Sequence, residues 1–191
     1  MTKPIGAIVL AAGSSTRFGS SKLLAELHST KPVFQQTMER ISAVFSARVV
    51  VTRPELLASV QPLATNTTVH SFDNAERGMG ATLAFAAKHV GSWGGCVVCL
   101  GDMPFVAEST YRLIALQLTQ SSIVIPTIGA KTGNPVAFGS NYFSELTKLD
   151  GDSGGRKIIE LHPDAVQRLA VDDPGILQDI DTQGDLARYQ D

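Results

Sequence analysis

The chain has no pronounced charge of either sign and no long apolar run. Its formal net charge is −2 over 191 residues and lysine and arginine form no run, so we expect no nucleic-acid surface of the kind that binds by neutralising phosphates. No apolar stretch approaches the roughly 18 residues that span a bilayer, and the N-terminus lacks the pattern of a secretory signal. We therefore expect a cytoplasmic protein that binds neither membranes nor nucleic acid.

Cysteine is nearly absent, with only Cys96 and Cys99. Their C-x-x-C spacing occurs in zinc and redox sites, but both fall in a predicted strand, where residues three apart point to opposite faces. No second Cys/His pair has ligand spacing. We expect two buried thiols that do not meet.

Histidine-based catalytic motifs are missing as well. The four histidines have no partner at catalytic spacing, and His-Glu-x-x-His does not occur. Transfer between phosphates is not excluded by this, because an attacking phosphate monoester with a second pKa near about 6 is already anionic at neutral pH. Such a reaction needs positioning and charge neutralisation rather than a general base.

What the chain does contain is 43% hydrophobic residues, arranged as alternating strand-like and helix-compatible segments. This alternation is typical of an α/β fold with a mostly parallel sheet. The length and the lack of a composition break predict a single domain over residues 1–191. We expect strands at 5–11, 47–52, 67–72, 95–100, 122–127 and 134–138, and helices at 33–45, 80–90, 107–119, 140–148 and 154–161.

The most informative segment follows the first strand. Residues 5–10 are continuously apolar, as in a strand buried on both faces, and they lead into a loop of small residues. Arg17 offers a planar fork for phosphate oxygens and Lys22 a compact charge, which together suit a nucleoside triphosphate. The spacing matches neither the Gly-x-x-x-x-Gly-Lys-Ser/Thr loop nor the Gly-x-Gly-x-x-Gly fingerprint. An ordinary strand-to-helix loop with two solvated cations is the alternative.

Candidate carboxylates occur after one predicted strand and within an extended segment near the C-terminus. Asp102 comes shortly after strand 95–100, at the sheet edge where parallel α/β folds bind ligands. Asp179 and Asp181 alternate along an extended segment and so share one side. Mg²⁺ bound to a triphosphate takes one or two carboxylates, which predicts Asp102 and Asp181 as metal ligands and leaves Asp179 open. The alternatives are a turn or cap role for Asp102 and a cap role for Asp181 before a helix at 183–188.

Two glycine-containing loops complete the set of candidate segments. In the loop at 131–138, Gly133 and Pro135 shape a turn before a strand. The loop at 150–156 contains glycines, which leave its backbone amides accessible, and it leads into a predicted helix. The N-terminus of a helix favours an anion. Hairpin and capping roles explain much of both loops without a ligand.

These segments resemble the MobA-like nucleotidyltransferases, and within them the molybdenum cofactor cytidylyltransferases. They occur in the family's order and extend over nearly the whole chain. The resemblance rests on residues 10–13 with Arg17, Gly19 and Lys22, on Asn74 with Gly78 and Met79, on 101–104, on 133–136 with Phe138 and 151–156, and on 179–182 with Asp185 and Leu186.

The resemblance implies a three-layer α/β/α nucleotidyltransferase fold of the glycosyltransferase-A type, which is Rossmann-like with a mostly parallel sheet. It also implies an Mg²⁺-dependent enzyme that transfers CMP from CTP to the phosphate of a molybdenum-pterin cofactor and releases pyrophosphate, with a molybdenum hydroxylase as client. The Ala-Ala-Gly form at 11–13 resembles the cytidylyl branch. The alternatives are a guanylyl or sugar-phosphate nucleotidyltransferase, and a non-catalytic carrier of the pterin cofactor.

Roles for individual residues follow from the same resemblance. It implies that Arg17, Lys22 and Asp102 are catalytic and that Asp102 and Asp181 hold the metal. Departures from the family pattern occur at Phe18, where relatives commonly have Met, and at Gln183, where they have Pro. The implied nucleotide-binding residues are Leu10, Ala11, Ala12, Gly13, Arg17, Lys22, Gly78 and Thr82, and the implied acceptor-binding residues are Gly133, Asn134, Pro135, Asp152 and Arg156.

Overall fold

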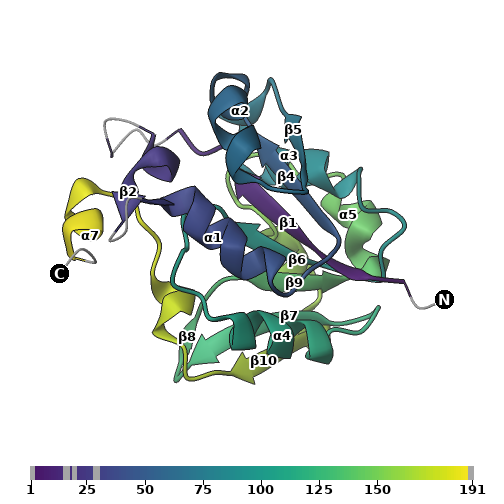
Figure 1. Cartoon of the computed structure of the whole chain (residues 1–191). Coiled ribbons are helices and arrows are strands. Elements are labelled where there is room, and N and C mark those ends of the chain that lie inside the picture. Colours follow the sequence, from purple (N-terminus) through teal and green to yellow (C-terminus); the bar gives the residue numbers. More distant parts are fainter. Residues whose placement is uncertain (1–2, 15–17, 19–20, 28–30, 189–191) are drawn as a thin grey trace.

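The computed structural model of the chain describes residues 3–14, 18, 21–27 and 31–188 (Figure 1). Arg17 and Gly19, which the sequence singles out, lie outside these residues. Among the helices described, none combines the length and the apolar character that crossing a bilayer requires.

Strand β1 (Ile5–Ala11) lies in the middle of the sheet, between β4 (Arg48–Thr52) and β6 (Gly95–Leu100), and runs parallel to both. Its residues from position 6 onward are all buried, which explains why the sequence there is continuously apolar. Strand β5 (Thr68–Ser71) extends the parallel arrangement beyond β4 and forms one edge. These four strands agree with the predicted segments within a residue or two.

The other half of the sheet contains both parallel and antiparallel strand pairs. Strand β7 (Ile123–Ile128) pairs in parallel with β10 (Val166–Ala170) and antiparallel with β9 (Val136–Gly139) and β8 (Lys131–Thr132). Because only a short turn separates β7 from β8 and β9, the chain returns without a crossover helix, and the pairing is antiparallel. Among the described residues the sheet has eight strands, in the order β10-β7-β9-β6-β1-β4-β5 with β8 beside β7. A mostly parallel sheet is thereby confirmed.

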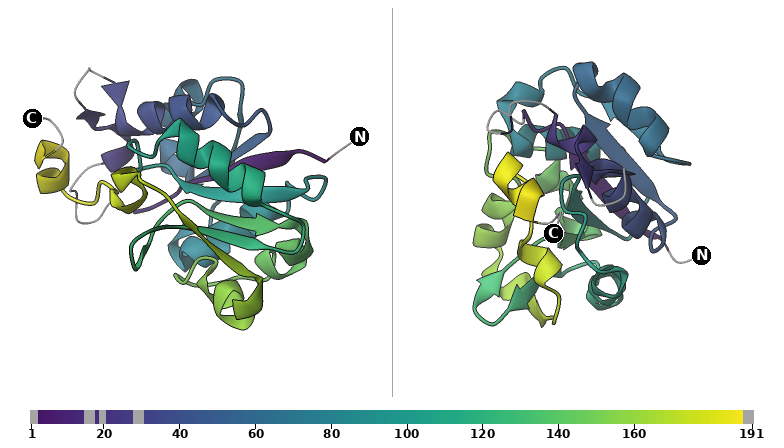
Figure 2. Two further views of the ribbon diagram at one scale, coloured as in Figure 1. Left: turned by 90° about the horizontal axis from the view of Figure 1, so that it is seen from below. Right: turned by 60° about the vertical axis from the view of Figure 1, so that its left-hand side comes forward.

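Helices cover both faces of this sheet, so the molecule has three layers (Figure 2). Helices α1 (Val33–Ser42), α2 (Pro54–Val60) and α4 (Glu108–Gln117) bury apolar side chains on one face. On the other face lie α3 (Met79–Ala87), α5 (Phe143–Leu146) and α6 (Arg156–Leu161). The three-layer α/β/α prediction is confirmed, whereas α2 and β10 are elements that the sequence did not predict.

A small third cluster joins the segment between β1 and α1 to the C-terminal segment. Helix α7 (Gln183–Arg188) lies beside the short ribbon of β2 (Glu26–Leu27) and β3 (Lys31–Pro32) in Figure 1. Buried Leu186, Leu27 and Ile180 belong to one apolar cluster there. Short 3₁₀ turns complete the described elements at Lys22–Leu24, Gln61–Leu63, Ala75–Arg77, Ser140–Tyr142, Pro163–Ala165 and Pro174–Leu177.

The two cysteines of β6 lie on opposite faces of the sheet. Cys99 belongs to the core beneath α1 and α4, and Cys96 to the core beneath α3 and α5. Both are buried and free, as predicted. Burial raises the pKa of the Cys96 thiol to about 12 and that of Cys99 further still, so neither thiol is reactive at neutral pH.

Candidate functional site

A cleft of about 620 Å³ opens where β1, β4 and β6 end at their carboxyl edge. This is the edge at which parallel α/β sheets bind ligands. The cleft gathers residues from segments that are far apart in the sequence. Its lining consists of Leu10, Ala11, Ala12, Gly13, Ser14, Lys22, Leu23, Arg53, Pro54, Glu55, Asp73, Ala75, Glu76, Gly78, Met79, Thr82, Leu100, Asp102, Asp152, Asp179 and Asp181.

The charged centre of this cleft is a lysine held between two aspartates. The Lys22 ammonium lies 2.5 Å from Asp102 Oδ2 and 2.6 Å from Asp181 Oδ1. Lys22 and Asp102 each expose 13% of the side chain and Asp181 exposes 36%, so water screens the first contact poorly. Three residues that the sequence selects for phosphate and metal binding therefore meet at one point.

For both Lys22 and Asp102, burial and the charge of the other residue shift the pKa in opposite directions. Burial alone would lower the pKa of the Lys22 ammonium, but the Asp102 charge and hydrogen bonds to both carboxylates outweigh it and raise the pKa. For Asp102, burial raises the pKa above its ordinary value, the Lys22 charge offsets this only in part, and Asp179 adds to the rise. The nearby Lys22 charge thus favours the ionised form of the Asp102 carboxylate, which burial disfavours.

The backbone around Asp102 positions its side chain at the strand end. Gly101 donates its N–H to the Leu10 carbonyl at 2.9 Å, which continues the pairing of β6 with β1. The Asp102 carbonyl accepts a 3.2 Å bond from the Ile180 amide, so the C-terminal segment is fastened directly to this turn. Helix α4 begins six residues later, and its N-cap position is Ala107 rather than Asp102.

Asp181 is available to Lys22 because another residue caps α7. Thr182 Oγ1 accepts a 3.1 Å bond from the Asp185 amide, and the Asp185 carboxylate accepts from the Thr182 amide at 2.9 Å. This reciprocal pair is a capping box with aspartate in the third position. Thr182, and not Asp181, therefore caps the helix.

The donor set suits a hard divalent cation that also binds phosphate. Asp102 and Asp181 both present carboxylate oxygens to a single positive charge, the Lys22 ammonium, and Mg²⁺ and Mn²⁺ prefer such oxygen ligands. Within the described part of the chain, however, no group of three or more His, Cys, Asp or Glu side chains is placed to hold a metal. The protein thus offers part of a coordination sphere, and a triphosphate would supply further oxygens.

The N-terminus of α3 and the loop at 150–155 form one wall of the cleft. Gly78 has a φ of 103°, and a Cβ there would lie 2.7 Å from the Gly151 carbonyl oxygen. Gly80 donates its amide to that same carbonyl at 2.6 Å. Thr82 lines the cleft, but its hydroxyl donates to the Gly78 carbonyl at 3.1 Å, so this group also supports the helix turn.

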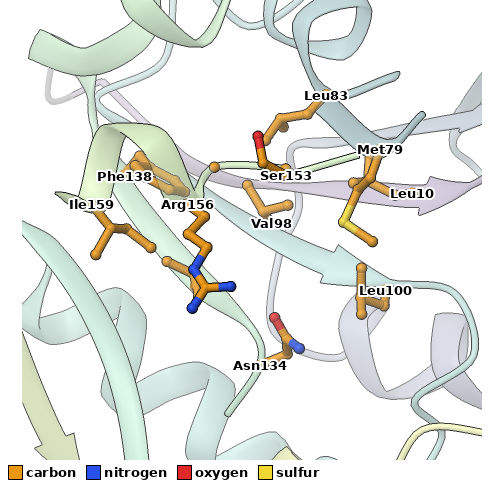
Figure 3. A pocket seen from close by; sticks show the side chains of 13 residues that line it. Leu10, Met79, Leu83, Val98, Leu100, Asn134, Phe138, Ser153, Arg156 and Ile159 are labelled. Atoms are coloured by element: carbon orange, nitrogen blue, oxygen red, sulfur yellow. The ribbon is translucent and has the colours of Figure 1, made fainter. Parts of the chain in front are cut away.

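A second, mainly apolar pocket of about 180 Å³ adjoins the cleft (Figure 3). The two cavities share Leu10, Met79 and Leu100. Figure 3 shows Asn134 beside the pocket and the Arg156 guanidinium extending over it. Arg156 also pairs with Glu160 at 3.2 Å, and its side chain is 78% exposed. The remaining lining is Leu83, Val98, Val136, Phe138, Ser153, Gly154, Gly155 and Ile159.

The predicted acceptor residues are thus divided between the two cavities. Asn134 and Arg156 line the pocket, whereas Asp152 lines the larger cleft. Gly133 and Pro135 line neither of them. Gly133 donates its amide to the Pro126 carbonyl at 2.9 Å and packs so closely on Ile176 that a Cβ would not fit, which is a structural role.

Some residues of the cleft were not predicted from the sequence. Arg53 and Glu55 lie just after β4, and Asp73 and Glu76 lie just after β5, and all four line the cleft. Their position in the sequence, just after two predicted strands, could have identified them. Strands β4 and β5 run in the same direction as β1 and end at the same edge of the sheet, where ligands bind. Asp179, which was left open, also lines the cleft.

Comparisons with known proteins agree with this architecture. The family model described as MobA-like NTP transferase domain matches residues 7–168. Bifunctional protein GlmU of Jannaschia sp. (strain CCS1) is 30% identical over an alignment of 165 residues that covers 83% of this chain. The chain spans only about a third of that relative's length, 34%.

Two solved structures extend the likeness over the full chain. The crystal structure of Rv0371c from Mycobacterium tuberculosis H37Rv is 30% identical with a TM-score of 0.85, covering 100% of this chain and 98% of that one. The complex of Rv0371c with manganese is 27% identical with a TM-score of 0.80, covering 100% and 99%.

Proposed function

The chain belongs to the MobA-like NTP transferase domain family, and from this premise we propose that it transfers CMP from CTP to the phosphate of a molybdenum-pterin cofactor. The single observation that carries the proposal is the cluster of Lys22, Asp102 and Asp181 in the cleft at the strand ends. It combines a cation for phosphate oxygens with two carboxylates for a divalent metal.

In the proposed reaction, an oxygen of the acceptor phosphate attacks the α-phosphorus of CTP. A new P–O bond forms, the bond from the α-phosphorus to the bridging oxygen breaks, and pyrophosphate leaves with the electron pair. Lys22 donates hydrogen bonds to triphosphate oxygens and neutralises part of their charge. Arg17, outside the described residues, is proposed to do the same from the preceding loop.

Asp102 and Asp181 are the residues that would hold the metal. Bound Mg²⁺ supplies positive charge to the phosphate oxygens. Asp102 is the more deeply placed of the two, and its carboxylate keeps a fixed position because the backbone on either side of it is hydrogen-bonded to Leu10 and Ile180. The manganese complex of Rv0371c is consistent with a divalent ion in this family.

The cytidine part of the proposal rests on residues 11–13, which border the cleft with Gly78 and Thr82. Ala11 and Ala12 are buried and have no polar side-chain atoms, so recognition of a base at this strand end would fall to backbone groups. Backbone groups are suited to read the polar edge of a base. The Ala-Ala-Gly form, which resembles the cytidylyl branch, is what favours cytosine over guanine.

The adjoining pocket supports an acceptor with a ring system rather than a sugar. Leu83, Val98, Val136 and Phe138 would leave sugar hydroxyls without hydrogen-bond partners. A flat heterocycle can pack its faces on these side chains, and the polar edge of a pterin ring would find hydrogen-bond partners among Asn134, Ser153 and Arg156 of the same pocket. Such a ring carrying a phosphate matches the pterin acceptor.

Pyrophosphate release tests the proposal directly. Purified protein is incubated with Mg²⁺, one of CTP, GTP, UTP or ATP, and either the molybdenum-pterin cofactor or a sugar 1-phosphate, and the product mass is determined. We expect pyrophosphate and a cytidylylated product only with CTP and the pterin. Turnover with GTP or with a sugar phosphate would replace the substrate assignment. Tight pterin binding without pyrophosphate would identify a carrier instead.

Nucleotide preference can also be measured without the acceptor. A ligand present at about 100 times its dissociation constant stabilises the folded state by roughly 2.7 kcal/mol. CTP with Mg²⁺ is therefore expected to raise the melting temperature more than the other three nucleotides at equal concentration.

A further inference from the structure

The position of Lys22 has a bearing on how a metal enters the cleft. Its ammonium occupies the point on which the Asp102 and Asp181 carboxylates converge, at 2.5 Å and 2.6 Å. A divalent cation bound by both carboxylates would have to lie at nearly the same point. Two cations cannot share it, because their repulsion in a poorly screened site would be severe.

We propose that Lys22 acts as an internal counter-ion that closes the metal site until a triphosphate binds and draws the ammonium away. The inference rests on the proposed function for the identity of Asp102 and Asp181 as metal ligands, and it adds a binding order to that site. Metal and triphosphate then bind with positive coupling. The coupling is reciprocal, so each ligand strengthens the binding of the other by the same factor.

The burial of Asp102 is the reason for such an exchange. Its side chain is only 13% exposed, and a buried carboxylate without a compensating cation is costly. Lys22 provides that cation when neither ligand is present. A lysine is suited to this exchange because its compact charge sits on a flexible four-carbon stem and can move to a nearby phosphate without a backbone shift.

The partial donor set explains why the triphosphate is needed. Over the described residues, no cluster of three metal-binding side chains exists, so the two carboxylates would have to displace the ammonium while supplying only part of the ion's oxygen ligands. A triphosphate alters the competition between the ammonium and the metal ion for the two carboxylates. It offers the ammonium new anionic partners and offers the metal additional oxygens.

Manganese titration of the nucleotide-free protein tests the proposal, with free Mn²⁺ followed by electron paramagnetic resonance. In Lys22→Met the carboxylates lack the Lys22 charge, and we expect Mn²⁺ to bind tighter than in wild type by about tenfold or more. Lys31→Met is the matched control, because Lys31 pairs with Glu39 at 2.9 Å on the exposed surface. It should leave Mn²⁺ affinity unchanged.

Unchanged or weaker Mn²⁺ binding in folded Lys22→Met would overturn the proposal. If this variant does not fold, Lys22→Gln takes its place, and a labelling measurement needs no variant at all. The wild-type protein is acetylated with an amine-reactive ester, with and without Mn²⁺ at concentrations that bind, and modification of Lys22 is read by mass spectrometry. We expect Mn²⁺ to increase Lys22 modification severalfold while Lys31 stays constant. Equal modification with and without bound Mn²⁺ would contradict the exchange.

These measurements are independent of turnover. Tighter Mn²⁺ binding in Lys22→Met together with no pyrophosphate release in wild type would retain the internal counter-ion and reject the transferase. Turnover in wild type with unchanged Mn²⁺ binding in the variant would do the reverse.

Discussion

The Asp173 carboxylate accepts a 2.6 Å hydrogen bond from the Thr110 hydroxyl, 63 residues earlier in the chain. It also accepts the Ala107 amide at 2.9 Å and the Gly175 amide at 3.0 Å. Asp173 is 8% exposed, so its charge is satisfied by these donors rather than by water. One buried carboxylate thus joins the start of α4 to the segment that carries Asp181 into the cleft.

Replacing this carboxylate should destabilise the fold. We expect Asp173→Ala to lower the free energy of unfolding by about 2–4 kcal/mol, because buried amide and hydroxyl donors lose their acceptor. Urea denaturation measures the effect. Asp164→Ala, which removes an exposed carboxylate, should stay within about 0.5 kcal/mol of wild type. Equal losses in the two variants would show that the Asp173 network contributes little.

A methyl group at Gly78 should disturb the wall of the cleft. Gly78 has a φ of 103°, and the added Cβ would collide with Asp152 and with the Gly151 backbone. We expect Gly78→Ala to cost about 1–3 kcal/mol and to weaken CTP binding, since the loop must move. Gly91→Ala is the matched control because its Cβ meets nothing within 4 Å. Calorimetric titration with CTP should separate the two, and wild-type affinity in Gly78→Ala would remove this wall from the nucleotide site.

Central strands were predictable and edge elements were not. The sequence predicts β1 because burial on both faces demands an unbroken apolar run. Strand β10 lies at the sheet edge with three of its five residues exposed, so no apolar pattern distinguishes it from a loop. Helix α2 is short, with seven residues beginning at Pro54, and offers too few turns for a clear period.

The candidate site likewise has parts that the sequence predicts and parts that it does not. Asp102 could be found because it follows a buried strand at a predictable edge. Its contact with Lys22, and that of Lys22 with Asp181 across 159 residues, depends on how β1, β6 and the C-terminal segment pack together. Local patterns carry no such information. The same holds for Gly133, whose close packing against Ile176 depends on where the C-terminal segment lies in the fold.

Stability should depend on pH through His70. Burial and the charge of neighbouring His89, whose ring stacks on it at 3.9 Å, lower the pKa of His70 below its ordinary value of 6.5. As pH falls below about 6.5, the unfolded chain takes up a proton that the folded protein resists, so unfolding becomes easier. Stability is therefore present above that pH and declines below it.

The variant His70→Phe should flatten this dependence, because phenylalanine keeps an aromatic ring beside Phe85 and His89 without a titrating group. Urea unfolding at about pH 5.5 and about pH 7.5 measures the slope in both proteins. A variant with the same pH slope as wild type would assign the effect to other groups.

Asp102→Asn tests the metal assignment through activity. The amide keeps the size of the side chain but removes the charge that would hold Mg²⁺, and loss of one preorganised electrostatic group costs about 10²–10³ in rate. We expect kcat for pyrophosphate release to fall by that factor or more. The fold should survive, because burial already disfavours the charged form of Asp102 and Lys22 retains Asp181. Asp164→Asn, an exposed change of the same kind, should keep full activity. Near wild-type turnover in a folded Asp102→Asn protein would mean that the metal binds elsewhere and that Asp102 serves only as the partner of Lys22.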